Sequence, residues 1–188
     1  TTGLVGSEMC IRDRSIVIKE NKEYAEKISF IQNAVGAVPS PFDCYLLTRS
    51  IKTLSVRMKQ HNENAIAVSN YLSNHPKIEK VFFPGTDKRH KEIAEKQMDG
   101  FGGMMSFVID SDINGVKTFL KNLNLFTLAE SLGGVESLIE HPAIMTHASI
   151  DPSIREKLGI SETLLRISVG IEDVDDLISD LDQALSKI

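Results

Sequence analysis

Three side chains in the second half of the chain could form a pocket for a small carboxylate. Glu130 and Ser131 end an apolar run and precede two glycines, whereas Arg166 lies inside a second apolar run, Leu164–Val169. A guanidinium matches a carboxylate with two parallel hydrogen bonds, and glycines let a backbone approach a ligand closely. Two neighbouring strands that hold these residues together would therefore make an anion site.

Each of these features also has an ordinary structural interpretation. Arg166 fits equally well as half of an ion pair with an internal acid, because an unpaired arginine is costly to bury. A strand that ends in two glycines is more often a plain tight turn than an anion site. His141 and His147, with Glu136 and Glu140 nearby, match no zinc spacing and have no supporting cysteine pair, so we expect capping and packing roles for them.

The composition is that of an ordinary globular protein. The 188 residues are 41% hydrophobic and 25% charged, with a formal net charge of −5, and basic and acidic residues are interleaved. No basic face stands out, which argues against nucleic-acid binding. No apolar run approaches the roughly 20 residues that cross a bilayer, and no signal peptide is visible. The only cysteines, Cys10 and Cys44, make no disulfide framework, so we expect a cytoplasmic location, with Cys44 in the core.

The first third of the chain predicts a foreign leader followed by helices. Residues 1–14 show no periodicity, and Val5–Arg14 resembles a translated sequencing adapter, although a mobile native leader is the alternative. We expect a strand at Ser15–Lys19 and a helix at Glu23–Asn33. One long helix, or two joined end to end, should run from Phe42 to His75.

An apolar seam follows this long helical segment. Its members recur at spacings of three and four: Ile51, Leu54, Met58, His61, Ala65, Val68 and Leu72. The seam is too short for a free coiled coil, so we expect it to pack on its own chain or on a partner subunit. His61 should then be a core histidine rather than a ligand.

From residue 78 onward, strand and helix patterns alternate. Strands are expected at 78–83, 104–109, 125–129 and 164–169, and helices at 88–98, 113–123 and 174–185. This alternation predicts a compact α/β sandwich of four or so strands with helices on one face, and a domain boundary near residue 75.

Several segments carry a family resemblance. Phe30–Leu47, continued by Ile51–Met58, resembles the mid-chain signature of the Cys/Met-metabolism family of pyridoxal-phosphate enzymes. Thr127–Ser149 is closer still to the cystathionine γ-lyases and γ-synthases of that family, and Arg166–Asp173 completes the pattern. The resemblance runs from about residue 15 to the C-terminus.

The resemblance implies an α/β fold, the C-terminal part of a fold-type I pyridoxal-phosphate-dependent transferase. Residues 1–14 would be the non-native leader, and 15–75 a remnant of the large cofactor domain with a long linker helix. Residues 76–188 would form the small C-terminal α/β sandwich domain. The family works on small amino-acid substrates as a tetramer built from dimers, so we expect a homo-oligomer.

The resemblance also implies roles for five residues. Arg166 matches the arginine that holds the substrate α-carboxylate, and Ser131 and Leu132 match residues that line that site. Asn33 matches an active-site asparagine. Glu130 matches a position where synthases and γ-lyases carry Glu, β-lyases typically an aromatic residue and methionine γ-lyases an apolar one.

The residues that hold the cofactor are expected outside this sequence. The Schiff-base lysine should precede the Ser15 strand, but the first lysine present is Lys19. The cofactor-ring aromatic, the pyridinium aspartate and the phosphate ligands belong to the same missing part. We therefore expect a C-terminal portion with no catalytic residue of its own, which is inactive as given and a doubtful binder of pyridoxal 5′-phosphate.

Three functions remain open from the sequence. The first is cleavage of L-cystathionine to cysteine, 2-oxobutanoate and ammonia, as in γ-lyases. The second is the γ-synthase reaction, which joins an O-acylhomoserine to cysteine, and Glu130 does not separate the two. The third is a non-catalytic assembly or binding domain.

Overall fold

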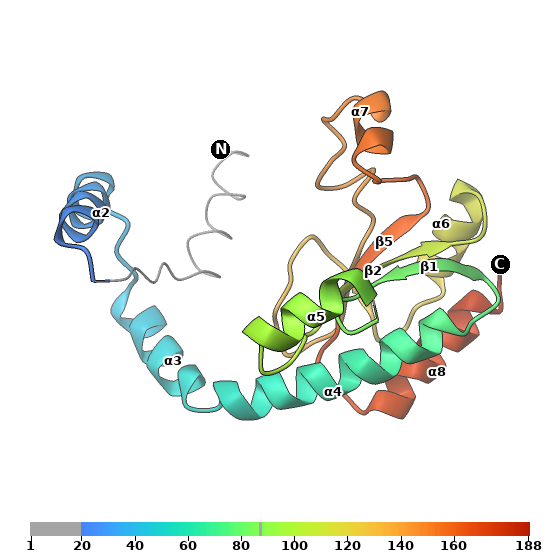
Figure 1. Cartoon of the computed structure of the whole chain (residues 1–188), viewed down its shortest axis with the longest axis horizontal. Coiled ribbons are helices and arrows are strands. Elements are labelled where there is room, and N and C mark those ends of the chain that lie inside the picture. Colours follow the sequence, from blue (N-terminus) through green and yellow to red (C-terminus); the bar gives the residue numbers. More distant parts are fainter. Residues whose placement is uncertain (1–19, 87) are drawn as a thin grey trace. The chain divides into compact units, whose positions relative to one another are not determined.

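The computed structural model describes residues 20–86 and 88–188, which form two compact units that divide at Leu54/Ser55 (Figure 1). The expected leader, 1–14, and the expected strand Ser15–Lys19 lie outside the described residues. The expected domain boundaries at residues 14 and 75 stay a prediction.

The first unit contains helices α2 (Lys22–Val35) and α3 (Pro41–Ile51). Asn21 caps the start of α2 by accepting the Tyr24 N–H, and Gly36 ends this helix with a φ of 72°. Neither helix buries a side chain. The prediction that Cys44 lies in the core is therefore wrong, because Cys44 is exposed on α3.

Helix α4 (Leu54–Ser73) follows after a short break, so the alternative of two helices is confirmed. The apolar seam divides along its length: Ile51, Leu54 and Met58 are exposed, whereas the later members are buried. His61 is a core histidine as predicted, and its Nδ1–H donates to the Val169 carbonyl at 2.7 Å.

The second unit is built on a five-stranded sheet with the order β1-β2-β5-β4-β3. Its strands are β1 (Ile78–Phe82), β2 (Met104–Ile109), β3 (Thr127–Leu128), β4 (Leu138–Glu140) and β5 (Leu164–Ser168). Neighbouring strands are antiparallel except β3 and β4, which are parallel. The α/β class and four of the strands were predicted, but β4 was not.

Four helices accompany the sheet: α5 (Lys88–Gln97), α6 (Ile113–Lys121), α7 (Pro152–Lys157) and α8 (Val174–Leu185). All except α7 were predicted. Helices α4, α6 and α8 contribute to one apolar cluster with β2 and β5, and α4 and α8 run beneath the sheet in Figure 1. Phe107 and Leu165 are fully buried in this cluster, where each such side chain stabilises the fold by about 1.5–3 kcal/mol.

Asp180 on α8 fixes the chain that leads into β3. Its carboxylate accepts the backbone N–H groups of Asn124 and Leu125 at 2.8 Å and of Phe126 at 3.1 Å. Burial acts to raise the pKa of Asp180, but these donors hold that pKa below its usual value. The clamp sets where β3 begins, and hence where the Glu130 segment emerges from the sheet.

We predict that Asp180→Asn lowers the free energy of unfolding by about 2–3 kcal/mol. The NH2 group that replaces one oxygen cannot accept hydrogen bonds, so backbone N–H groups that now donate to that oxygen lose their acceptor. Denaturant unfolding measures the loss, and Asp110→Asn on the exposed surface is the matched control. Equal stability of the two variants would contradict the clamp.

Candidate functional site

The pairing of β4 with β5 places Glu140 directly opposite Arg166. Glu140 Oε2 lies 2.5 Å from Arg166 Nη2, and their side chains are 1% and 25% exposed. The ion-pair interpretation of Arg166 is therefore confirmed as a contact. A quarter of the Arg166 side chain remains exposed, so a carboxylate role stays compatible with this geometry.

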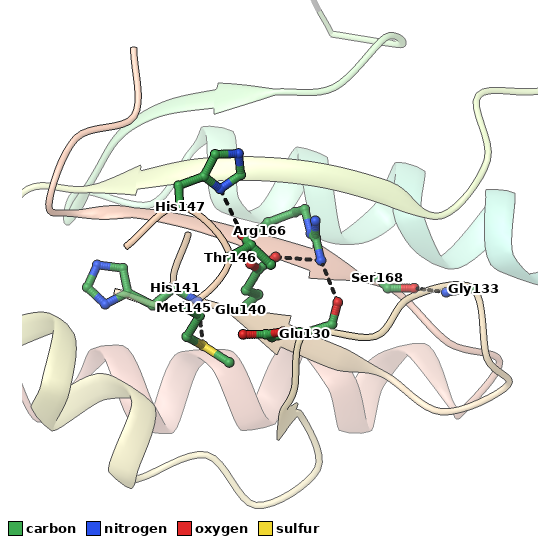
Figure 2. Close-up of polar contacts among 9 residues, drawn as sticks. All are labelled: Glu130, Gly133, Glu140, His141, Met145, Thr146, His147, Arg166 and Ser168. Atoms are coloured by element: carbon green, nitrogen blue, oxygen red, sulfur yellow. Dashed lines mark hydrogen bonds and ion pairs between the residues drawn. The ribbon is translucent and has the colours of Figure 1, made fainter. Parts of the chain in front are cut away.

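A second contact links Arg166 to the predicted substrate segment. Arg166 Nη2 donates to the backbone carbonyl of Glu130 at 3.0 Å, and Figure 2 shows the guanidinium between Glu130 and Glu140. The side chain of Glu130 is exposed, and those of Ser131 and Leu132 are half-buried. The structure thus brings the segment from Glu130 to Leu132 beside Arg166, as expected from the sequence.

Asn33, the remaining predicted residue, lies on α2 in the first compact unit. Its side chain is exposed, and its backbone carbonyl accepts the Gly36 N–H as part of the helix end. Its active-site role stays a prediction.

The glycine segment after Ser131 is a fixed turn. Gly133 has a φ of 77°, which favours glycine, and its N–H donates to Ser168 Oγ at 2.9 Å (Figure 2). Further along, Ser137 donates to the Glu172 carboxylate through its N–H at 2.6 Å and its hydroxyl at 2.9 Å. The tight-turn interpretation therefore fits the glycines, because the Gly133 N–H already has an acceptor within the chain.

Thr146 and His147 extend the contacts of Glu140. The Thr146 hydroxyl donates to Glu140 Oε1, and His147 Nδ1 lies 2.7 Å from Thr146 Oγ1 (Figure 2). A carboxylate only accepts hydrogen bonds, so the single Thr146 hydrogen points to Glu140 and His147 Nδ1–H donates to Thr146.

The sequence did not identify Glu140 as the partner of Arg166. The one available signal was an acid next to the apolar pair Leu138–Ile139.

His141 has the packing role that was predicted for it. It is fully buried, and its Nε2–H donates to the Glu162 carbonyl at 2.8 Å. Burial lowers the pKa of its imidazole.

No group of three or more His, Cys, Asp or Glu residues that could hold a metal is found within residues 20–86 and 88–188. No helix in the same described part is long and apolar enough to span a bilayer.

Comparison with known proteins gives the same family for nearly the whole chain. Residues 14–186 match the family described as Cys/Met metabolism PLP-dependent enzymes. The chain is 53% identical to the cystathionine γ-lyase of Dictyostelium discoideum over 92% of its own length and 45% of that protein. It is also 51% identical to the cystathionine β-lyase of Coxiella burnetii, over 90% of the chain and 44% of that protein.

Solved structures agree with this match. The cystathionine γ-lyase of Lactobacillus plantarum superposes with a TM-score of 0.85 at 44% identity, over 91% of this chain and 45% of its own. The cystathionine γ-synthase of Xanthomonas oryzae has the same TM-score at 42% identity, over 94% of this chain and 47% of its own. The chain thus spans about half the length of the relatives it matches.

We predict that Arg166→Met lowers the free energy of unfolding by about 2–4 kcal/mol, because Glu140 is left buried without its cation. Adding Glu140→Leu should recover most of that loss, since the double variant buries no unpaired charge. Denaturant unfolding of the single and double variants measures the coupling, with Arg49→Met on α3 as the control. Additive losses would show that the two side chains do not interact.

We also predict that stability falls as the pH drops below about 6.5, the pKa of an unfolded histidine. The folded pKa of His141 is lowered, so the unfolded chain binds more protons below that pH and is favoured. His141→Gln should make the slope of unfolding free energy against pH shallower. The slope that remains includes the contribution of His75, whose pKa is also lowered by burial. An unchanged slope in His141→Gln would rule out this role.

Proposed function

The chain belongs to the Cys/Met metabolism family of PLP-dependent enzymes, and from this premise we propose that it forms the substrate-carboxylate side of a transsulfuration active site. The observation that carries the proposal is the partly exposed side chain of Arg166, whose guanidinium contacts both Glu140 and the Glu130 carbonyl. A fixed, partly desolvated arginine suits the planar carboxylate of an amino acid.

The reaction we favour is cleavage of L-cystathionine to cysteine, 2-oxobutanoate and ammonia. The identity of 53% to γ-lyases of Dictyostelium discoideum and Bos taurus supports it. The family resemblance adds that Glu130 suits a γ-lyase or γ-synthase better than a β-lyase. The second candidate is the γ-synthase reaction on an O-acylhomoserine, which the match to the Xanthomonas oryzae structure supports.

Pyridoxal 5′-phosphate supplies the electron sink for the chemistry of this family. Around Arg166 the described residues offer a cation, a backbone carbonyl and carboxylates. None of the hydrogen bonds or ion pairs of Arg166, Glu130 and Glu140 within residues 20–86 and 88–188 involves a lysine. These groups fit the substrate side of such a site and not the side that holds the cofactor.

In this proposal the residues of the chain bind and orient the substrate. Arg166 attracts the α-carboxylate at its exposed edge, and the segment from Glu130 to Leu132 borders the place where the rest of the amino acid lies. Glu140 pairs with the guanidinium from the interior, so neither charge is left buried without a partner before the substrate binds. The chain does this by position and charge, without a proton transfer of its own.

The exposed apolar side chains of α2 and α3 support an oligomeric parent protein. Phe30, Val35, Phe42 and Tyr45 are each more than half exposed. Exposed large apolar side chains in such number favour association. A homo-oligomer, with a second copy covering these helices, is therefore part of the proposal.

We predict that the 188-residue chain binds L-2-aminobutyrate and not propylamine, the same molecule without its carboxylate. Amide signals of Ser131–Gly134 should shift with the acid alone in an NMR titration. Arg166→Lys should weaken binding at least about tenfold, because one ammonium cannot replace the planar fork. Arg49→Lys is the control. Equal binding of acid and amine would contradict the carboxylate site.

Activity distinguishes the two reactions. The complete reading frame that contains these residues, supplied with pyridoxal phosphate, should release 2-oxobutanoate from L-cystathionine. The γ-synthase reaction would be favoured over the lyase reaction if the protein instead forms cystathionine from cysteine and O-succinyl- or O-acetylhomoserine and releases no 2-oxobutanoate. The 188 residues alone, in which no lysine precedes Lys19, should show neither activity nor an absorbance band of covalently bound cofactor.

A further inference from the structure

Glu140 has a part in this site that the family match does not assign to it. We propose that Glu140, supported by the Thr146 hydroxyl, is a positioning residue that holds the Arg166 guanidinium in the orientation that receives the substrate carboxylate. The inference rests on the proposed function, since it concerns how Arg166 is aimed.

The first support is the contrast in burial between the two partners. Glu140 is 1% exposed and Arg166 is 25% exposed, and Oε2 meets Nη2 at 2.5 Å. The carboxylate therefore contacts the guanidinium from the interior of the unit, while part of the Arg166 side chain stays exposed. A long arginine side chain has many rotamers, and a fixed buried anion selects the few that keep this contact.

The second support is that Glu140 is itself held from two directions. The register of β4 against β5 fixes its backbone opposite Arg166. The Thr146 hydroxyl donates to Oε1, so the carboxylate is bonded through one oxygen and paired through the other. His147 Nδ1–H in turn donates to Thr146 Oγ1 at 2.7 Å. The order of contacts His147, Thr146, Glu140, Arg166 thus runs from a half-buried surface position to the guanidinium.

The positioning role of Glu140 and its negative charge lead to opposite predictions for ligand binding when Glu140 is removed. As a negative charge beside Arg166, it competes with an incoming carboxylate, so removing it should tighten anion binding. As a positioning group, it reduces the freedom of Arg166, so removing it should weaken binding by about tenfold, the usual cost of immobilising one flexible side chain. A glutamine at position 140 keeps an oxygen for Arg166 but no charge, and an alanine keeps neither.

The test is an NMR titration of the 188-residue chain with L-2-aminobutyrate in four variants. We expect Glu140→Gln to bind as tightly as the unchanged chain or more tightly, and Glu140→Ala to bind about tenfold more weakly. Thr146→Val, at an exposed position, should weaken binding about two- to threefold. Ser149→Ala, an exposed neighbour in the same segment, is the matched control and should change nothing.

A readout without ligand keeps the test independent of binding. The Nε–H and Nη–H signals of Arg166 should be resolved in the unchanged chain and in Glu140→Gln, because an ion-paired or hydrogen-bonded guanidinium rotates slowly. They should broaden in Glu140→Ala, which loses the ion pair and keeps the hydrogen bond to the Glu130 carbonyl. Thr146→Val should give the intermediate result even if the alanine variant unfolds.

The outcomes separate the two proposals. If Glu140→Ala binds as well as the unchanged chain, or better, while Arg166→Lys binds poorly, Glu140 only competes for Arg166 and the positioning role is overturned. If Arg166→Lys also binds normally, the carboxylate site itself fails, and the proposed function fails with it.

Discussion

The ion pair between Glu140 and Arg166 is the interaction on which the candidate site depends. It lies where β4 and β5 pair, and its acid is almost wholly buried. A buried carboxylate is tolerated only with a cation and further hydrogen bonds, so β4, β5 and the Thr146 segment must be in place together. The Arg166 side chain is nevertheless 25% exposed. The observed pairing of Arg166 with Glu140 is therefore compatible with the proposed binding of a carboxylate by the same side chain.

The rest of the α/β unit keeps that pair in position. Asp180 on α8 binds three consecutive backbone N–H groups and so fixes the entry to β3. On the other side, Asn64 of α4 donates to the carbonyls of Gly170 and Glu172. Glu172 in turn accepts from Ser137 just before β4. The strands that carry Glu140 and Arg166 are thus anchored to helices whose apolar faces fill the core.

Much of this fold follows from residue periodicity. The apolar run Met104–Ile109 and the apolar stripe of α8 predict β2 and α8 within a residue or so. Strand β4 escapes prediction because three buried residues show no alternation, and one of them is an acid. The pairing of Glu140 with Arg166 could not be predicted either, because it follows from the register of β4 against β5, and β4 itself was not predicted. Cys44 was misplaced because an apolar helical pattern does not tell which surface covers it.

A crystal structure of the complete protein with L-2-aminobutyrate bound tests the central claim most directly. We expect the ligand carboxylate to lie within hydrogen-bonding distance of the Arg166 guanidinium, with Glu140 still paired to Nη2 and the segment from Glu130 to Leu132 bordering the ligand. A carboxylate bound elsewhere, with Arg166 engaged only by Glu140 and the Glu130 carbonyl, would contradict it.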